Sequence, residues 1–180
     1  RSLLARLVRA GWLVGHGPLW RFARPVQRQA VYKMLTEGRR IALHGRAARA
    51  LEATGAGVSH PVRAYQRAHH LCEAHAHEEL LRTVMTLVHS GFGRAHPRRV
   101  HSLASWGLES IDALPPDPER KRMAVLLLTR AADAADRLGA RTKQREWLDR
   151  LADLELDPDG DPQTAGRVYL LHGRFAASTG

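Results

Sequence analysis

From about residue 60 onward, apolar residues recur at the three- and four-residue spacing of one helix face, and glycine or proline separates the runs. The runs are Leu80, Leu81, Val84, Leu87 and Val88; Val100, Leu103, Ala104, Gly107, Leu108 and Ile111; Leu127, Leu128, Ala131, Ala132, Ala135 and Leu138; Trp147, Leu148, Leu151 and Leu154; and Val168, Leu171 and Phe175. Helices of roughly 12–20 residues with short connections are typical of antiparallel helical repeats. We therefore expect degenerate tetratricopeptide-like repeats over residues 57–180, with residues 117–158 as one helix-turn-helix unit.

Breakers mark the connections between these helices. Residues 114–118 read LPPDP, the clearest interruption in the chain. Gly139 is expected to cap the helix before it, and Pro61 to open a helix behind Ser59 or His60. Residues 54–58 and 157–160 are predicted to be loops, and Gly91 and Gly93 to end the helix that contains Leu87.

The N-terminal part has a different pattern. Residues 2–10 carry leucine and valine at helical spacing, and Gly11 is expected to stop that helix. Two short aromatic runs, 12–14 and 19–22, flank a Gly/Pro cluster and predict a β-hairpin. A helix should start at Pro25 with the stripe Val26, Ala30, Val31, Met34 and Leu35, break at Gly38, and be followed by a helix lined by Ile41, Ala47, Ala48 and Leu51. The predicted fold class is all-α with one small β-hairpin near the N-terminus.

The sequence argues against a disulfide-stabilised scaffold and against a membrane-spanning protein. The single cysteine, Cys72, cannot form an internal disulfide, which favours a reducing, cytoplasmic location. No apolar run is long enough to span a bilayer and no secretory leader is visible, so no membrane partner is expected. A helical pattern runs into the last residues, and we expect the chain to be an internal fragment of a longer protein, truncated at both ends.

The charge is unevenly distributed. The chain has 28 Lys+Arg against 18 Asp+Glu, a formal net charge of +10. Residues 1–50 hold 11 of the basic residues and one acidic residue, Glu37, whereas residues 51–180 hold 17 of each sign. An argument from charge about partners therefore applies to the first quarter of the chain.

Two segments in that quarter carry a resemblance. They read WRFARPVQRQAVY at residues 20–32 and, after Arg39 and Arg40, LHGRAARALE at residues 43–52. This pattern resembles a recurring segment of large bacterial signal-transduction (STAND/AAA-type) ATPases, which include the ATP-dependent LuxR-type transcription regulators and related kinase–ATPase and cyclase–ATPase fusions. Arg24 and Gln29 stand where that family often has His and Glu.

The resemblance implies a domain order. Residues 1–56 would be the end of a winged-helix-like module with its following helices, and residues 57–180 a tetratricopeptide-like sensor solenoid. ATP would bind in a missing upstream domain. Five residues are expected at the domain junction: Arg21, Phe22, Tyr32, Arg40 and His44. Phe22 and Tyr32 would be packing anchors there, and Arg40 and His44 would make polar contacts.

The partners of the basic quarter remain open at this stage. The arginines expected to contact either nucleic acid or an acidic protein surface are Arg6, Arg9, Arg21, Arg24 and Arg28. In the resembling ATPases the winged helix usually docks on neighbouring domains of the same chain, which favours docking over DNA. A protein or small-molecule effector is expected on the solenoid. The alternative is that the chain is a winged-helix transcription regulator that binds DNA.

No catalytic site is expected within the chain. None of the three lysines follows a glycine, so no phosphate-binding Walker A loop is present, and the segment should hold no cofactor. The segment HHLCEAHAH at residues 69–77 concentrates metal-binding side chains, and it is a weak alternative site for a metal-binding sensor or enzyme. Its candidate ligands are His69, Cys72, Glu73, His75 and His77. The simpler interpretation is that His69 or His70 packs in the core while His75 and His77 lie at a helix junction.

Overall fold

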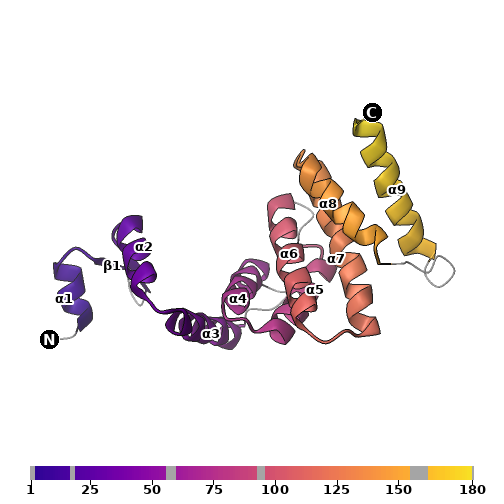
Figure 1. The fold of residues 1–180 in the computed structure, drawn as a ribbon. Helices are drawn as coiled ribbons and strands as arrows, with labels where there is room; N and C mark the ends of the chain where they lie inside the picture. The colour runs from indigo at the N-terminus through magenta and orange to yellow at the C-terminus, as the bar shows by residue number, and fades with distance from the viewer. Residues whose placement is uncertain (1–2, 17–18, 56–59, 93–95, 155–161, 180) are drawn as a thin grey trace. The chain divides into compact units, whose positions relative to one another are not determined.

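The computed structural model describes residues 3–16, 19–55, 60–92, 96–154 and 162–179. It confirms the fold class: the described chain is mostly α-helical, with one two-stranded antiparallel hairpin near the N-terminus (Figure 1). The chain divides into two compact units, residues 1–43 and residues 44–180, here called the N-terminal unit and the repeat unit. This division falls earlier than the boundary at residue 56 considered above, because His44 and Ala48 already pack within the repeat unit.

The N-terminal unit contains α1 (Leu3–Arg9), β1 (Leu13–His16), β2 (Leu19–Phe22) and α2 (Pro25–Met34). Gly11 has a φ of 70°, a left-handed conformation that favours glycine and lets the chain turn away from α1 as predicted. In the hairpin Leu13 pairs with Phe22 and Gly15 with Trp20. A Cβ atom on Gly15 would lie 2.6 Å from the Trp20 ring, so the indole packs over a backbone that only glycine provides.

A glutamine connects the end of the first helix to the start of the second. The Gln27 side chain accepts a hydrogen bond from the Arg24 backbone N–H (3.1 Å) and donates one to the Gly11 carbonyl (3.2 Å). These bonds cap α2 and hold its first turn against the chain that leaves α1. Pro25 occupies the first turn, as the sequence indicates.

The predicted break at Gly38 is wrong. The third helix, α3 (Glu37–Ala53), contains Gly38 in its first turn, and the interruption lies just before it, at Leu35 and Thr36. Thr36 supplies the helix start, since its side-chain oxygen accepts from the Arg39 N–H (3.4 Å) and its carbonyl accepts from the Arg40 N–H. A threonine cap therefore sets this boundary, and the glycine is tolerated inside the helix.

The repeat unit continues with α4 (Pro61–Glu73), α5 (His77–His89), α6 (Pro97–Ala113), α7 (Pro118–Arg137), α8 (Arg141–Ala152) and α9 (Pro162–Thr179). Each helix from α4 to α9 packs against the next, and α4 also contacts α6 as α7 contacts α9 (Figure 1). Contacts between neighbours and next-nearest neighbours are those of stacked helical hairpins. The helix-turn-helix predicted over residues 117–158 corresponds to α7 and α8, although residues 155–158 lie outside the described chain, as do Ser59, Gly93 and most of the two predicted loops.

The core of the repeat unit follows the predicted apolar runs. Leu80, Val84, Leu87, Leu103, Leu108, Leu127, Leu128, Leu148 and Leu151 are at most 1 % exposed. Gly107 lies where α6 crosses α7, since an added Cβ would lie 2.6 Å from Leu127 Cδ1. Asp117 caps α7 by accepting from the Glu119 N–H, and Gly139 (φ 67°) ends it, as predicted. No helix in the described chain is both long enough and apolar enough to cross a bilayer.

Candidate functional site

The N-terminal unit exposes many of its large apolar side chains. Among residues 3–43, none whose exposure is described is buried, and the predicted stripe on α2 stays accessible, with Val26 64 % and Met34 83 % exposed. The exposed large apolar side chains of this unit are Leu3, Leu4, Val8, Trp12, Trp20, Val26, Met34 and Leu43. Among the residues whose exposure is described, this unit therefore has no core of its own.

The same unit carries the basic excess. Residues 1–43 contain nine Lys+Arg and one acidic residue, Glu37, a formal charge of +8. The five arginines expected to contact a partner, Arg6, Arg9, Arg21, Arg24 and Arg28, are all exposed. None of the five forms an ion pair within the described chain. Positive charge and apolar surface therefore occur together on this unit.

Of the five residues expected at a domain junction, four lie in the N-terminal unit and one, His44, lies in the repeat unit. Tyr32 and Arg40 meet, with the Arg40 guanidinium carbon 5.6 Å from the centre of the Tyr32 ring. Phe22 is half-buried on β2, while Arg21 beside it is exposed. His44 belongs to the repeat unit and contacts α4 there. Although Arg40 and His44 are four residues apart on one helix, they contact different partners.

The histidines of residues 69–77 are distributed over two helices and the bend between them. His69 and His70 are half-buried on α4, where His44 Nδ1 lies 2.9 Å from His70 Nδ1 and the His69 ring lies 5.7 Å from that of Trp106. His77 starts α5 and its Nδ1 lies 3.4 Å from Ser110 Oγ. Within the described residues, no three His, Cys, Asp or Glu side chains converge on a position that could hold a metal ion.

His75 has a specific structural role. Its φ of 53° is left-handed, and the N–H groups of His75 and Ala76 donate to the carbonyls of Cys72 and Leu71, which closes α4 with a Schellman motif. Glycine usually takes this position, as Gly139 does at the end of α7. The bend at His75 ends α4 inside the cluster. A ligand set extending from His69 to His77 on a single helix is therefore not formed.

Cys72 has the properties of a packed thiol. Burial, reinforced by the Glu109 and Glu73 carboxylates, raises the pKa of Cys72 to about 11. A thiol must be deprotonated to act as a nucleophile or a metal ligand, so this environment opposes both. The adjacent Glu73 carboxylate further disfavours the thiolate form of Cys72 at neutral pH.

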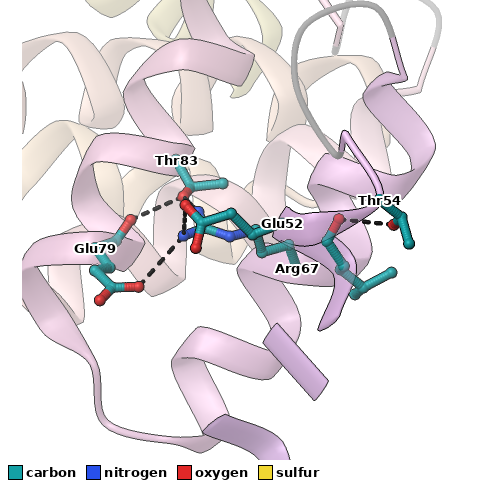
Figure 2. Close-up of polar contacts among 6 residues, drawn as sticks. Glu52, Thr54, Arg67, Glu79 and Thr83 are labelled. Carbon is teal, nitrogen blue, oxygen red and sulfur yellow. Dashed lines mark hydrogen bonds and ion pairs between the residues drawn. The ribbon is translucent and has the colours of Figure 1, made fainter. Parts of the chain in front are cut away.

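A group of polar contacts in the repeat unit centres on a residue that the sequence patterns did not single out. Arg67 on α4 is buried, and it donates to Thr83 Oγ1 (2.5 Å), Glu79 Oε2 (3.3 Å) and Glu52 Oε1 (3.0 Å) (Figure 2). Its position in the stripe of Ala64, Ala68 and Leu71 is the signal that could have revealed it. Arg67 thus connects the end of α3 to both α4 and α5.

A cavity of about 250 Å³ lies among α5, α6, α7 and α9 of the repeat unit. Arginines from two helices, Arg130, Arg137 and Arg174, line it. These arginines are not part of a sequence motif, so their spacing in the chain does not mark them as a group.

The comparisons with known proteins do not assign the chain to a family. No protein-family model, curated protein or solved structure matches the chain. The likeness of residues 20–32 and 43–52 to signal-transduction ATPases therefore stays a prediction from the sequence.

Proposed function

We propose that the chain is a non-catalytic regulatory and protein-interaction segment of a bacterial signal-transduction ATPase, working in the cytoplasm. In this proposal the N-terminal unit docks on an acidic, partly apolar surface of the upstream nucleotide-binding domain, which holds the ATP. The repeat unit senses an effector and passes its state on through that contact. The main support is that residues 3–43 expose eight large apolar side chains, and that none of the residues there whose exposure is described is buried.

The kind of surface favours a protein partner. Interfaces between proteins are enriched in aromatic residues and arginine, the types that Trp12, Trp20 and Arg21 supply here. Contacts to the DNA backbone need positive charge but gain little from exposed valine, leucine or methionine. A charge of +8 over residues 1–43 favours an anionic partner, and the carboxylates of a protein surface would supply that charge.

Hydrogen–deuterium exchange tests the docking role directly. In the 180-residue chain, amides of the hairpin and α2 should exchange much faster than those of α6 and α7, since few buried contacts protect them. In a longer polypeptide that includes the upstream domain, exchange in the hairpin and α2 should slow by roughly tenfold or more. Hairpin amides as protected in the short chain as those of α7 would contradict the proposal.

Charge reversal gives the matched control. The triple variant Arg21→Glu, Arg24→Glu, Arg28→Glu should abolish the added protection in the longer polypeptide. Arg122→Glu, an exposed position on α7, should leave it unchanged. Equal losses in both variants would indicate a nonspecific charge effect and argue against a docking surface.

DNA binding is the second candidate, supported by the exposure of the five arginines. If all five contact phosphates, affinity for duplex DNA should fall by about 500-fold between roughly 50 and 200 mM salt. Fluorescence anisotropy of a labelled duplex measures this slope. No binding at the lower salt concentration would eliminate DNA as the partner and leave the docking proposal intact.

A further inference from the structure

The cavity of the repeat unit is lined by both apolar and charged side chains. It lies between the C-terminal end of α5, the first turns of α6, the second half of α7 and the last part of α9. Its apolar lining consists of Leu87, Val88, Pro97, Val100, Leu103 and Ala134. A volume of about 250 Å³ corresponds to roughly eight water molecules at ~30 Å³ each, enough for a small organic molecule.

The charged lining is mostly arginine. Arg130 and Arg137 lie two turns apart on one face of α7, so that both face the cavity, and Arg174 reaches it from α9. Arg130 is half-buried, whereas Arg137 and Arg174 are exposed. One arginine of the lining is therefore partly shielded from solvent, and the other two are open to it.

The two aspartates of the lining are already engaged by arginines outside it. Asp133 Oδ2 accepts from Arg167 Nη2 (2.6 Å), and Asp136 Oδ1 accepts from Arg141 Nη1 (2.5 Å). Neither Arg167 nor Arg141 is among the lining residues. The lining thus contains three arginines and two aspartates, and each aspartate also pairs with an arginine outside the lining.

We infer that this cavity binds a small organic anion with an apolar portion, a carboxylate or a phosphate ester. The apolar portion would occupy the interior formed by Leu87, Val100 and Ala134, and the anionic group would face Arg130, Arg137 and Arg174. Guanidinium groups recognise carboxylate and phosphate through paired, charge-assisted hydrogen bonds. The inference rests on the proposed sensor role of the repeat unit, because it names the chemical class of the effector.

Binding would act on the packing of the unit's last helix. Arg174 is the contribution of α9 to the cavity, whereas the other lining residues belong to α5, α6, α7 and the turn after α5. An anion that engages Arg137 and Arg174 together joins α9 to α7. The bound ligand should therefore favour one position of α9 on the stack.

The test is a ¹H–¹⁵N NMR titration of the 180-residue chain with four probes: benzoate, phenyl phosphate, inorganic phosphate and neutral benzyl alcohol. Benzoate or phenyl phosphate should shift amides of Leu87, Val100, Ala134 and Arg174 in a saturable way below roughly 20 mM, since a millimolar ligand saturates there. Tighter binding of benzoate would identify a carboxylate effector, and tighter binding of phenyl phosphate a phosphate ester. Both outcomes support the inference, whereas inorganic phosphate should bind more weakly than the better aromatic anion.

Variants separate the charge from nonspecific binding. The double variant Arg137→Gln, Arg174→Gln should weaken binding of the better probe by about tenfold or more. Arg122→Gln, on the same helix α7 but outside the cavity, should bind as the wild type does. Thermal unfolding of each variant checks that it folds, and the comparison of benzoate with benzyl alcohol needs no variant.

Three results would overturn the inference: no saturable shift with either aromatic anion, equal binding of benzyl alcohol, or equal losses in the control and the double variant. None of these bears on amide exchange in the hairpin and α2, which tests the docking role separately. Conversely, a hairpin that is fully protected in the short chain would refute docking and leave the titration interpretable.

Discussion

The N-terminal unit and the repeat unit both contain amphipathic helices, yet only in the repeat unit do the described residues form a core. The stripe on α2 includes Met34, which is 83 % exposed, whereas Leu127 in a similar stripe on α7 is 0 % exposed. The difference is in the neighbours: α7 packs against α6, α8 and α9, while within its unit α2 contacts β2. An apolar stripe thus contributes to stability only where other elements cover it.

Truncation of a core side chain should show this contrast most strongly. Leu127→Ala is expected to cost about 2–5 kcal/mol of unfolding free energy, because it removes buried contacts and leaves a cavity. Met34→Ala should change it by less than about 0.5 kcal/mol. Urea unfolding followed by circular dichroism measures both. Similar losses at the two positions would remove the distinction between the units.

The next largest effect concerns arginine. Arg67→Ala should cost about 2 kcal/mol, mainly through lost packing of its buried stem and the lost bond to Thr83. Its carboxylate partners Glu52 and Glu79 are 61 % and 48 % exposed and add little. Arg40→Ala, which removes the contact over Tyr32, should cost no more than about 1 kcal/mol. A larger loss at Arg40 in the same urea experiment would show that the N-terminal unit is the better packed.

Two helical glycines should respond to alanine in opposite directions. Gly107→Ala should destabilise the repeat unit by about 1–3 kcal/mol, since the new methyl group meets Leu127 at 2.6 Å. Gly38→Ala has no atom within 4 Å to meet and should stabilise α3 by about 0.5–1 kcal/mol. Differential scanning calorimetry of the pair gives the sign of each change. Stabilisation by Gly107→Ala would mean that α6 and α7 are less closely packed.

The smallest change expected is at the end of α4. His75→Gly should stabilise the repeat unit by roughly 0.5–1 kcal/mol, because glycine adopts the left-handed conformation without steric cost. The gain should appear in the thermal midpoint of the repeat unit and leave amide exchange in the hairpin unchanged. Destabilisation would assign the His75 side chain a contact that outweighs its backbone strain.

Local patterns predicted most of the elements. Pro25 and Pro61 open helices, residues 114–117 separate two helices, Gly11 and Gly139 end helices, and the hairpin lies where aromatic residues flank a Gly/Pro cluster. The break assigned to Gly38 was wrong because a threonine cap two residues earlier sets the boundary. Glycine lowers helix stability by about 1 kcal/mol, which a capped helix of 17 residues tolerates.

The candidate sites were less predictable than the elements. The stretch of histidines in residues 69–77 suggested a shared ligand set, but the bend at His75 separates them, and His70 instead contacts His44 from α3. The basic surface of the N-terminal unit followed from charge counting alone. Its exposed apolar side chains did not, because periodicity cannot tell whether a stripe has a covering partner.

The sequence by itself determined the helical repeats, the N-terminal hairpin and the location of the excess charge, since spacing, caps and breakers act within a few residues of one another. Only the tertiary structure decided that Arg67 is buried and that Arg174 joins Arg130 and Arg137 around one cavity. It also decided that no side chain of the N-terminal unit whose exposure is described is buried. The physical reason is that burial and electrostatic partnership depend on residues distant in the chain. Arg67 needs Glu52, Glu79 and Thr83, and no pattern within α4 contains them.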